Sequence, residues 1–363
     1  MRILLLSDVN SVHTIKWARN LAESNIIVGI WSIAAPNSHE LENYENIIIH
    51  SPGGKQDRNS FFAKVKYITL LSDAKKFLKE FKPDILHAHY ASSYGLVGRL
   101  LRFRPFVLSV WGSDVYVFPK ANFLFKWILT TNLASADKIL STSRTMAEET
   151  IKYTNKEISV TPFGIDVDRF PYTFSEENNS FNIGCVKSLE KIYGIKYLIQ
   201  AFAVLVKKHS DKKMRLYIIG EGSEGNDLRT LAKDLGIFEH CVFTGKVPNT
   251  SVPEYLRCLD VVALPSLSES FGVAALEGSS MGKPVVASAV GGLPEVIDHN
   301  ETGILVQPGD VDGIAAALDF LFLNPSERKR LGENGRKKVM QYYNIKSNTD
   351  TMIDIYRKLL SYD

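Results

Sequence analysis

Short apolar runs alternate with longer amphipathic segments along the whole chain. Runs such as Arg2–Ser7 and Phe106–Val110 are almost continuously apolar, which is typical of strands buried on both faces of a parallel sheet. Amphipathic segments such as His13–Ser24 and Lys64–Phe81 separate them, so repeated βαβ units are predicted. The other predicted strands are Ile26–Trp31, Ile47–Ile49, Ile85–His87, Lys138–Ser141, Ile158–Thr161, Phe181–Val186, Arg215–Ile219, Cys241–Thr244, Val261–Leu264, Pro284–Ala287 and Gly303–Val306.

The alternation weakens once, in the polar stretch Phe170–Ser180, which is the predicted linker. We therefore expect two doubly wound, Rossmann-like α/β domains that face each other across a cleft. The N-terminal domain is expected to span residues 1–172 and the C-terminal domain residues 181–346. Residues 347–363 are predicted to form a last helix that packs back on the N-terminal domain. Ligands in such folds bind at the carboxyl ends of the strands, so the site is expected in the cleft.

Composition indicates where such a protein works. No apolar run approaches the ~18–20 residues of a membrane-spanning helix. The cysteines, Cys185, Cys241 and Cys258, are odd in number and lack the spacing of a metal site. Neither a disulfide framework nor a zinc site is therefore predicted, and a cytoplasmic location is expected.

Charge is divided unevenly between the two halves. Residues 1–170 hold 21 Lys and Arg against 16 Asp and Glu, a net +5, whereas the remainder holds 22 against 24, a net −2. A basic N-terminal half fits an acidic or membrane-bound partner, and ordinary variation of solvated faces is the alternative. The aromatic and basic segment Pro119–Leu129 either contacts the inner face of the plasma membrane or packs as a core helix. No nucleic acid partner is expected.

The most informative stretch of the chain runs from Glu269 to Glu277. Ser270 is a favoured N-cap residue, so a helix is predicted to begin there. The next three amides would then point out of the helix start, where free amides and the helix dipole form a site for phosphate. Glu277 would lie roughly 10 Å along the helix axis from the cap. Two carboxylates on either side of a phosphate site match a nucleotide-sugar, which carries hydroxyl-rich groups at both ends.

A glycine-rich turn follows one of the predicted strands of the second half. Gly220–Gly225 has the spelling G-x-G-x-x-G of a dinucleotide-binding turn. It follows the second strand of its domain rather than the first, and the next strand ends at Thr244 without the acidic residue that binds a ribose. NAD binding is therefore not favoured. A plain tight turn and a loop that lines the cleft with Gly220 and Gly222 remain as alternatives.

Together these motifs resemble the donor-binding half of retaining GT-B glycosyltransferases of family GT4, the glycosyl transferases group 1. The resemblance covers most of residues 160–310 and rests on the order and spacing of the motifs. They are Pro162–Asp166, Arg169–Phe170, Gly220–Gly222, Thr244–Val247, Ala263–Ser266, Glu269–Glu277, Gly282–Ala287, Gly291–Glu295 and Thr302–Val306. The family implies a GT-B fold and transfer of a sugar from a nucleotide-sugar to an acceptor.

The resemblance also implies roles for individual residues in donor binding. Glu277 would hold the ribose hydroxyls, and Glu269 would bind hydroxyls of the sugar. The backbone near Lys246 and Val247 would border the base. The backbone expected to approach sugar and phosphate belongs to Ser270, Phe271, Gly272 and Val273.

A leaving diphosphate needs positive charge, because fixed cations lower the barrier to its departure. The family often uses an Arg just after a glycine and a Lys several residues on. Here Cys185 stands at the Arg position, Lys191 fits the Lys position, and Lys187 is a candidate to supply the missing charge. No Asp-x-Asp pair follows a strand as a set of metal ligands. No cofactor or metal is therefore expected, and a UDP-sugar is the expected donor.

The first half matches the family more loosely. His87 and His89 lie two residues apart on a predicted strand and so share a face, and His89 is the expected cleft and catalytic residue. Trp111 replaces a His that is common in the family. Asp114 either contacts the acceptor or caps the following helix, and His13 either contacts phosphate or acceptor or has a structural role.

The combined prediction is a retaining glycosyltransferase of the hexosyl- or N-acetylhexosaminyl-transferase type. Its acceptor would be a glycan, a lipid-linked molecule or a small molecule, as in bacterial surface polysaccharide or glycoconjugate synthesis. The alternatives are a GT-B-fold sugar-nucleotide epimerase, which needs catalytic acids in the first domain, and a non-catalytic module that binds nucleotide-sugar or glycan. Transfer with inversion is a third alternative.

Overall fold

The chain forms two compact units in a computed structural model that describes residues 1–53, 70–173 and 180–361. The first unit comprises Met1–Gly164 together with Ile345–Asp363, and the second comprises Ile165–Asn344. The boundary at Gly164 precedes the predicted linker, because the residues that follow it pack on the second unit. Phe170 is buried there, and the amide of Thr173 donates to the carbonyl of Met281 over 3.0 Å. Residues 174–179 of the predicted linker lie outside the described residues.

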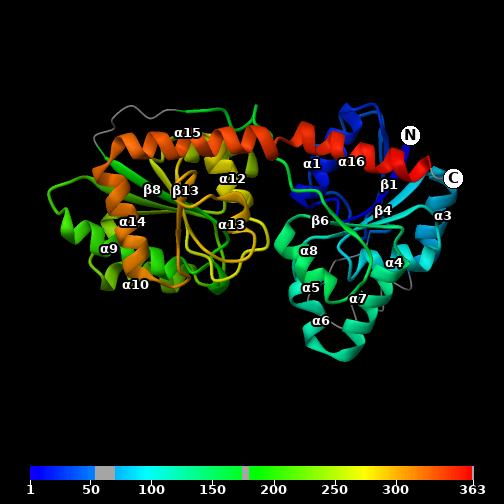
Figure 1. The fold of residues 1–363 in the computed structure, drawn as a ribbon, viewed down its shortest axis with the longest axis horizontal. Helices are drawn as coiled ribbons and strands as arrows, with labels where there is room; N and C mark the ends of the chain where they lie inside the picture. The colour runs from blue at the N-terminus through cyan, green and yellow to red at the C-terminus, as the bar shows by residue number, and fades with distance from the viewer. Residues whose placement is uncertain (54–69, 174–179, 362–363) are drawn as a thin grey trace. The chain divides into compact units, whose positions relative to one another are not determined.

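A parallel sheet of seven strands forms the centre of the first unit, in the order β3-β2-β1-β4-β5-β6-β7 (Figure 1). The strands are β1 (Arg2–Leu6), β2 (Ile27–Trp31), β3 (Ile47–His50), β4 (Ile85–His89), β5 (Phe106–Val110), β6 (Lys138–Ser141) and β7 (Ile158–Val160). The helices are α1 (Val12–Glu23), α3 (Leu71–Phe81), α4 (Tyr94–Leu101), α5 (Ser113–Tyr116), α6 (Phe118–Ala121), α7 (Phe123–Ser135), α8 (Arg144–Ile151) and α16 (Ile345–Leu360). The part of the predicted helix Lys64–Phe81 before residue 70 lies outside the described residues.

Alternate residues of the central strand β1 enter two separate cores, because successive side chains of a strand point to opposite faces. Leu4 and Leu6 pack with residues of α3, α4 and α7, whereas Ile3 and Leu5 pack with residues of α1 and α16. All four side chains are fully buried. The continuous apolar run at the start of the chain is therefore a strand covered on both faces, as its pattern predicts.

The last helix, α16, belongs to the first unit although it follows the second unit in sequence. Its Met352 and Ile353 are buried in the core that α1 covers. The Tyr356 hydroxyl lies 2.6 Å from His87 Nδ1, and His87 Nε2 lies 2.7 Å from the Ser109 hydroxyl. A buried polar chain thus ties α16 to two strands of the sheet, and both ring nitrogens of His87 have partners.

The second unit is also built on a parallel sheet, with six strands in the order β10-β9-β8-β11-β12-β13. The strands are β8 (Phe181–Val186), β9 (Met214–Ile219), β10 (Cys241–Gly245), β11 (Val261–Leu264), β12 (Val285–Ser288) and β13 (Gly303–Val306). The helices are α9 (Ile195–Lys208), α10 (Gly225–Asp234), α11 (Val252–Arg257), α12 (Val273–Ser280), α13 (Leu293–Val296), α14 (Val311–Leu323) and α15 (Pro325–Tyr342), with 3-10 turns η1 (Lys191–Tyr193), η2 (Phe238–His240) and η3 (Asn249–Ser251). Every strand predicted from the sequence is present, with bounds shifted by at most two residues, and the doubly wound α/β class is confirmed.

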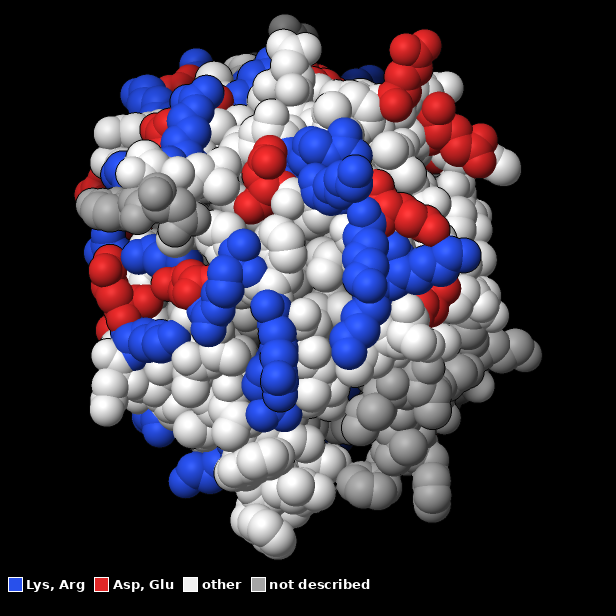
Figure 2. Space-filling view, turned by 90° about the vertical axis from the view of Figure 1, so that its right-hand side faces the viewer, with Lys and Arg blue, Asp and Glu red and all other residues white. Residues whose placement is uncertain are grey.

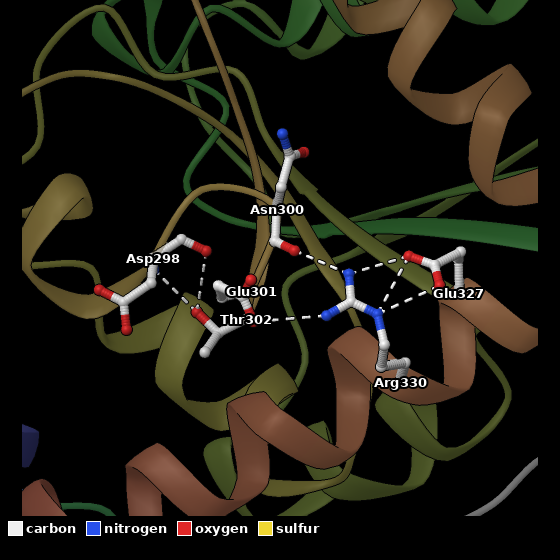
Figure 3. Close-up of polar contacts among 6 residues, drawn as sticks. All are labelled: Asp298, Asn300, Glu301, Thr302, Glu327 and Arg330. Atoms are coloured by element: carbon white, nitrogen blue, oxygen red, sulfur yellow. Dashed lines mark hydrogen bonds and ion pairs between the residues drawn. The ribbon is translucent and has the colours of Figure 1, made fainter.

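Polar contacts at the amino end of β13 hold the turn before that strand (Figure 3). The Arg330 guanidinium on α15 donates to the carbonyl of Asn300 over 2.8 Å and pairs with the carboxylates of Glu301 and Glu327. Thr302 closes the turn by accepting from the amide of Asp298 over 2.8 Å. This cluster lies where β13, the edge strand of the sheet, begins. Its charged groups stabilise the turn before that strand.

Candidate functional site

Loops from four neighbouring strands meet at the carboxyl ends of β8, β9, β11 and β12. The amide of Leu189, after β8, donates to the carbonyl of Glu221 after β9 over 2.9 Å. The amide of Gly292, after β12, donates to the carbonyl of Glu269 after β11 over 3.1 Å. The strand order reverses between β8 and β11, and this switch point is where doubly wound sheets bind ligands.

An ion pair occupies this switch point. The Lys187 Nζ, just after β8, lies 2.5 Å from the Glu269 Oε2, and the two side chains are only 14% and 8% exposed. The Lys187 ammonium also lies 4.4 Å from the centre of the Tyr193 ring. Burial by itself lowers the pKa of Lys187, but the Glu269 carboxylate outweighs burial and holds that pKa above its usual value. The pair therefore places a fixed cation and a fixed anion side by side in a sparsely hydrated position.

The helix behind this pair begins two residues later than the sequence predicts. The N-cap of α12 is Gly272, with φ +107°, and not Ser270. Phe271 is buried and packs 5.9 Å from the ring of Tyr343, so the chain turns into the helix only after it. Gly272 permits that turn because side chains rarely adopt its positive φ.

The later start changes the spacing that the sequence suggests. The amides of Ala275 and Leu276 both donate to the Gly272 carbonyl, so Gly272, Val273 and Ala274 carry the amides that lie before the first intrahelical bond. Glu277 is half-buried on α12 and lies about 7.5 Å, rather than about 10 Å, along the axis from the N-cap residue. A carboxylate therefore stands one turn behind a helix N-terminus whose amides attract anions.

Glycines allow the four loops to approach each other closely. A Cβ on Gly220 would lie 2.0 Å from the carbonyl oxygen of Lys187, and one on Gly222 would lie 2.5 Å from that of Leu189. A Cβ on Gly291 would lie 1.7 Å from the carbonyl oxygen of Glu269. Gly220 and Gly222 thus allow the loop after β9 to lie against the loop after β8.

We expect Gly291→Ala to displace the Glu269 loop, and Gly236→Ala is its matched control. Both glycines have positive φ, +53° and +72°, but a Cβ on Gly236 meets nothing within 4 Å. The control should therefore lose only about 1 kcal/mol of unfolding free energy from backbone strain. Gly291→Ala should lose about 1–3 kcal/mol more, because its Cβ overlaps a backbone carbonyl. Urea unfolding measures both, and equal losses would contradict the close approach.

The remaining predicted residues of the second unit are not part of the ion pair. Lys191 is exposed in η1, so Lys187 rather than Lys191 holds the buried position beside Glu269. Lys246 is exposed and lies 3.7 Å from Glu221, and Val247 is half-buried after β10. Tyr193 was not predicted as a site residue, because nothing in the sequence indicates that its ring packs against the Lys187 ammonium.

A second group of rings lies at the carboxyl ends of β1, β4 and β5 in the first unit. His89 is 2% exposed, its ring lies 4.5 Å from that of Trp111, and its Nδ1 lies 3.1 Å from the Ser7 hydroxyl. His13 stacks on Phe163 with ring centres 3.8 Å apart. Burial lowers the pKa of His89, and nearby positive charge on other histidines would lower it further, so the ring is neutral at neutral pH. The contacts of Ser7 and Phe163 with these histidines were not predicted from the sequence.

Asp114 lies beneath this ring group and does not face solvent. Its carboxylate is fully buried and accepts from the amides of Ala91 and Gly112, each over 2.7 Å. Burial raises its pKa, and the backbone hydrogen bonds oppose that change. Contact of this side chain with an acceptor, one of the two sequence-based alternatives, is therefore incorrect. Asp114 instead pins the loop after β5 to the loop after β4.

Comparison with known proteins now identifies the family. Residues 168–338 match the family described as glycosyl transferases group 1, and residues 2–143 match glycosyl transferase 4-like proteins. The chain belongs to the GT4 family of GT-B glycosyltransferases. This GT4 protein is 26% identical over 339 residues to N-acetyl-alpha-D-glucosaminyl L-malate synthase of Bacillus anthracis, covering 88% of this chain and 86% of that protein. It is 31% identical over 290 residues to D-inositol 3-phosphate glycosyltransferase of Corynebacterium jeikeium, covering 69% and 66% of the two chains.

Solved structures share the fold of this GT4 protein over its whole length. Sucrose-phosphate synthase from Thermosynechococcus elongatus aligns with a TM-score of 0.86 at 20% identity, covering 100% of both chains. Anabaena HepE, solved in complex with UDP, aligns with a TM-score of 0.83 at 18% identity, covering 99% of this chain and 100% of that one. These neighbours confirm the GT-B fold predicted from the motifs.

Within residues 1–53, 70–173 and 180–361, no group of three or more His, Cys, Asp and Glu side chains is arranged to hold a metal ion. Across the same part of the chain, no helix has the length and apolar character needed to cross a membrane.

Proposed function

We propose that this GT4 protein transfers a sugar, with retention of its anomeric configuration, from a UDP-sugar to an acceptor bound by the first unit. The observation that carries the proposal is the buried Lys187–Glu269 pair at the switch point of the second sheet, in front of the α12 N-terminus. Cation, helix amides and carboxylate are the groups that a diphosphate linked to a sugar requires. UDP is proposed as the nucleotide because HepE, of the same fold, was solved with UDP and with UDP-glucose.

In this proposal, the ligand replaces contacts that the protein makes with itself. Lys187 lies against Glu269, and an incoming diphosphate offers the ammonium a second anionic partner. Glu269 is then available to accept hydrogen bonds from the sugar hydroxyls, while the amides before Ala275 face the phosphates. Glu277, one turn into α12, would accept from the two ribose hydroxyls. Lys191 is exposed nearby and would add charge at the diphosphate.

The proposed reaction needs no side-chain nucleophile. The bond between the anomeric carbon and the diphosphate oxygen breaks, and its electron pair stays on that oxygen. The acceptor hydroxyl attacks the same face of the sugar, and its proton passes to the departing phosphate. Fixed positive charge from Lys187 and the helix amides stabilises the charge that develops there, and no bound metal or cofactor is invoked.

The first unit supplies the acceptor side of the proposal. The rings of His89, Trp111, His13 and Phe163 form an aromatic group at the carboxyl ends of its central strands. The faces of such rings pack against the apolar faces of sugars and other cyclic acceptors. A neutral His89 can hydrogen-bond an acceptor hydroxyl, since its buried ring does not carry a charge at neutral pH. We propose a glycan, lipid-linked or small-molecule acceptor of the kind used in surface polysaccharide or glycoconjugate synthesis.

A thermal-shift panel with UDP, GDP, ADP and CMP tests the nucleotide site. UDP at 100 times its Kd should stabilise the protein by about 2.7 kcal/mol, and the other nucleotides by less. Glu277→Gln should weaken UDP binding by roughly 10- to 100-fold, because hydrogen bonds to a charged group are worth about 1.5–3 kcal/mol. Glu254→Gln, at an exposed position of α11, is the matched control and should bind UDP normally.

The outcome that would overturn the proposal is a panel in which no nucleotide stabilises the protein, or in which Glu277→Gln binds UDP as tightly as the control. Product analysis by NMR distinguishes retention from inversion through the anomeric coupling of the new linkage. Release of free UDP and a rearranged sugar in the absence of acceptor would indicate the epimerase instead.

A further inference from the structure

His89 is held on one side by two buried hydroxyl groups. Its Nδ1 lies 3.1 Å from the Ser7 hydroxyl, and that hydroxyl lies 2.6 Å from the Thr14 hydroxyl on α1. Charged side chains gather on the surface of the protein, as Figure 2 shows for one side, but the Thr14–Ser7–His89 network is buried and its hydroxyls carry no charge. Solvent therefore does not decide which atom donates in each hydrogen bond, and the groups of the network must decide it themselves.

The Thr14 hydroxyl fixes the direction of the network. Within residues 1–53, 70–173 and 180–361, the Thr14 hydroxyl has one hydrogen-bond partner, the Ser7 hydroxyl. A hydroxyl has one hydrogen to donate, and a buried donor left without an acceptor is costly. Thr14 therefore donates to Ser7 Oγ, and Ser7 donates its own hydrogen to His89 Nδ1. The reverse direction would leave the Thr14 hydrogen without an acceptor.

This direction determines which nitrogen of His89 carries the hydrogen. Burial lowers the pKa of His89 well below its usual value, so the ring is neutral and has a single N–H. Because Nδ1 accepts from Ser7, that hydrogen lies on Nε2. The rings of His87 and Trp111 each have their centres 4.5 Å from that of His89 and hold its plane in place. No residue of the described part of the chain is hydrogen-bonded to Nε2, so its N–H is left for a ligand.

We infer that Ser7 and Thr14 are positioning residues that hold His89 in the Nε2–H tautomer, so that His89 binds an oxygen of the substrate as a hydrogen-bond donor. The group that this N–H recognises is an oxygen with a free lone pair, as in a hydroxyl, an ether or a phosphate. A ring in this form has no free lone pair on Nε2 and cannot take the proton of the acceptor. The inference rests on the proposed function for the role of His89, and it agrees with passage of that proton to the departing phosphate.

Nitrogen-15 NMR of the full chain tests the tautomer without any substrate. In protein labelled with nitrogen-15 histidine and studied at neutral pH, His89 should show a hydrogen bonded to Nε2 and none on Nδ1. The signals of His89 are identified by their loss in His89→Gln. Ser7→Ala removes the donor to Nδ1, so the tautomer with hydrogen on Nδ1 should also become populated. Hydrogen on Nδ1 in the parent protein would overturn the inference, whether or not the protein transfers a sugar.

Kinetics of sugar transfer separate positioning from stability. Ser7→Ala should lower kcat about three- to tenfold, which is the effect of one neutral hydrogen bond, and leave KM for the nucleotide-sugar unchanged. Thr14→Val should lower kcat in the same direction, and Thr14→Ser, which keeps the hydroxyl, should restore it. Thr150→Val is the matched control, because it removes an equally buried helix hydroxyl that donates to the carbonyl of Met146 over 2.7 Å. It should transfer sugar at the parent rate, and an equal fall of kcat in Thr150→Val and Thr14→Val would overturn the positioning role.

Two substitutions of His89 itself distinguish a donor from a base. His89→Gln places an amide N–H near the position of Nε2 but cannot accept a proton, whereas His89→Met has neither property. We expect His89→Gln to retain more activity than His89→Met. Tryptophan emission, which comes entirely from the first unit, shows whether each variant is folded. Equal activity of the two folded variants would overturn the donor role.

Discussion

Glu269→Gln is expected to lower kcat/KM for sugar transfer by about 100- to 1000-fold, the range seen when one preorganised transition-state contact is removed. The substitution keeps the size of the side chain and removes the charge that faces Lys187 at 2.5 Å. Because Glu269 is proposed to bind the sugar and Glu277 the ribose, the affinity for UDP should change little. The loss should therefore appear in turnover of the UDP-sugar, measured as product formed per unit time, and not in the UDP thermal shift.

The controls for this variant separate catalysis from folding. Glu254→Gln, at an exposed position of α11, should retain full activity. Breaking a buried ion pair costs about 3–5 kcal/mol when both groups are fully buried, and partial exposure of Lys187 reduces that cost. A melting curve taken with saturating UDP shows whether the variant is folded. Full turnover in folded Glu269→Gln would show that the ion pair takes no part in the mechanism.

The first unit is expected to lose stability as the pH falls from 7 to 5. Burial lowers the pKa of His87 from 6.5 to about 3, and burial also places the pKa of His89 well below its usual value. The unfolded chain therefore binds protons in this range that the folded chain does not, so stability is complete above about pH 6.5 and declines below it. His87 alone accounts for about 2 kcal/mol between pH 7 and pH 5, and His89 adds in the same direction.

Tryptophan fluorescence isolates this effect, because Trp17, Trp31, Trp111 and Trp127 are the only tryptophans of the sequence and all lie in the first unit. Urea unfolding followed by tryptophan emission should show a midpoint that falls steadily from pH 7 to pH 5. His39→Gln, which alters a histidine with an 89% exposed side chain, should leave that dependence unchanged. His89→Asn should reduce it. A midpoint independent of pH would show that the buried histidines do not govern stability.

The alternation of apolar and amphipathic segments was sufficient to predict both sheets. Strands such as β5 and β11 are apolar throughout because helices cover both faces, and their bounds could be read from the sequence without error. The start of α12 could not be read from the sequence, because two local preferences compete there. Ser270 favours capping, but Phe271 gains more by burial, and the positive φ of Gly272 lets the chain turn after it. Side-chain preference alone gives no measure of that competition.

The candidate site was predicted as a set of residues but not as a set of contacts. The run from Glu269 to Glu277 and the resemblance to the family identified Glu269, Lys187 and Lys191, yet only the structure shows that Lys187 reaches Glu269 while Lys191 is exposed. The difference arises because η1 carries Lys191 past the strand end, where the chain is no longer constrained by the sheet. The predicted contact of Asp114 with an acceptor was wrong for a related reason. A carboxylate after a strand can face a ligand or its own backbone, and the sequence around it does not distinguish the two.

The chain passes between the units twice, once after Gly164 and once after Asn344, so the second unit is an insertion within the first. A nonsense mutation just before Ile345 would leave the second unit whole and remove Tyr356 from the first unit. In such a truncated product the second unit would be expected to stay folded, while the amino-terminal unit, without its last helix, would be open to proteases. For expression of separate halves, the second unit is available as one continuous segment, whereas the first would need its two pieces joined by an artificial loop.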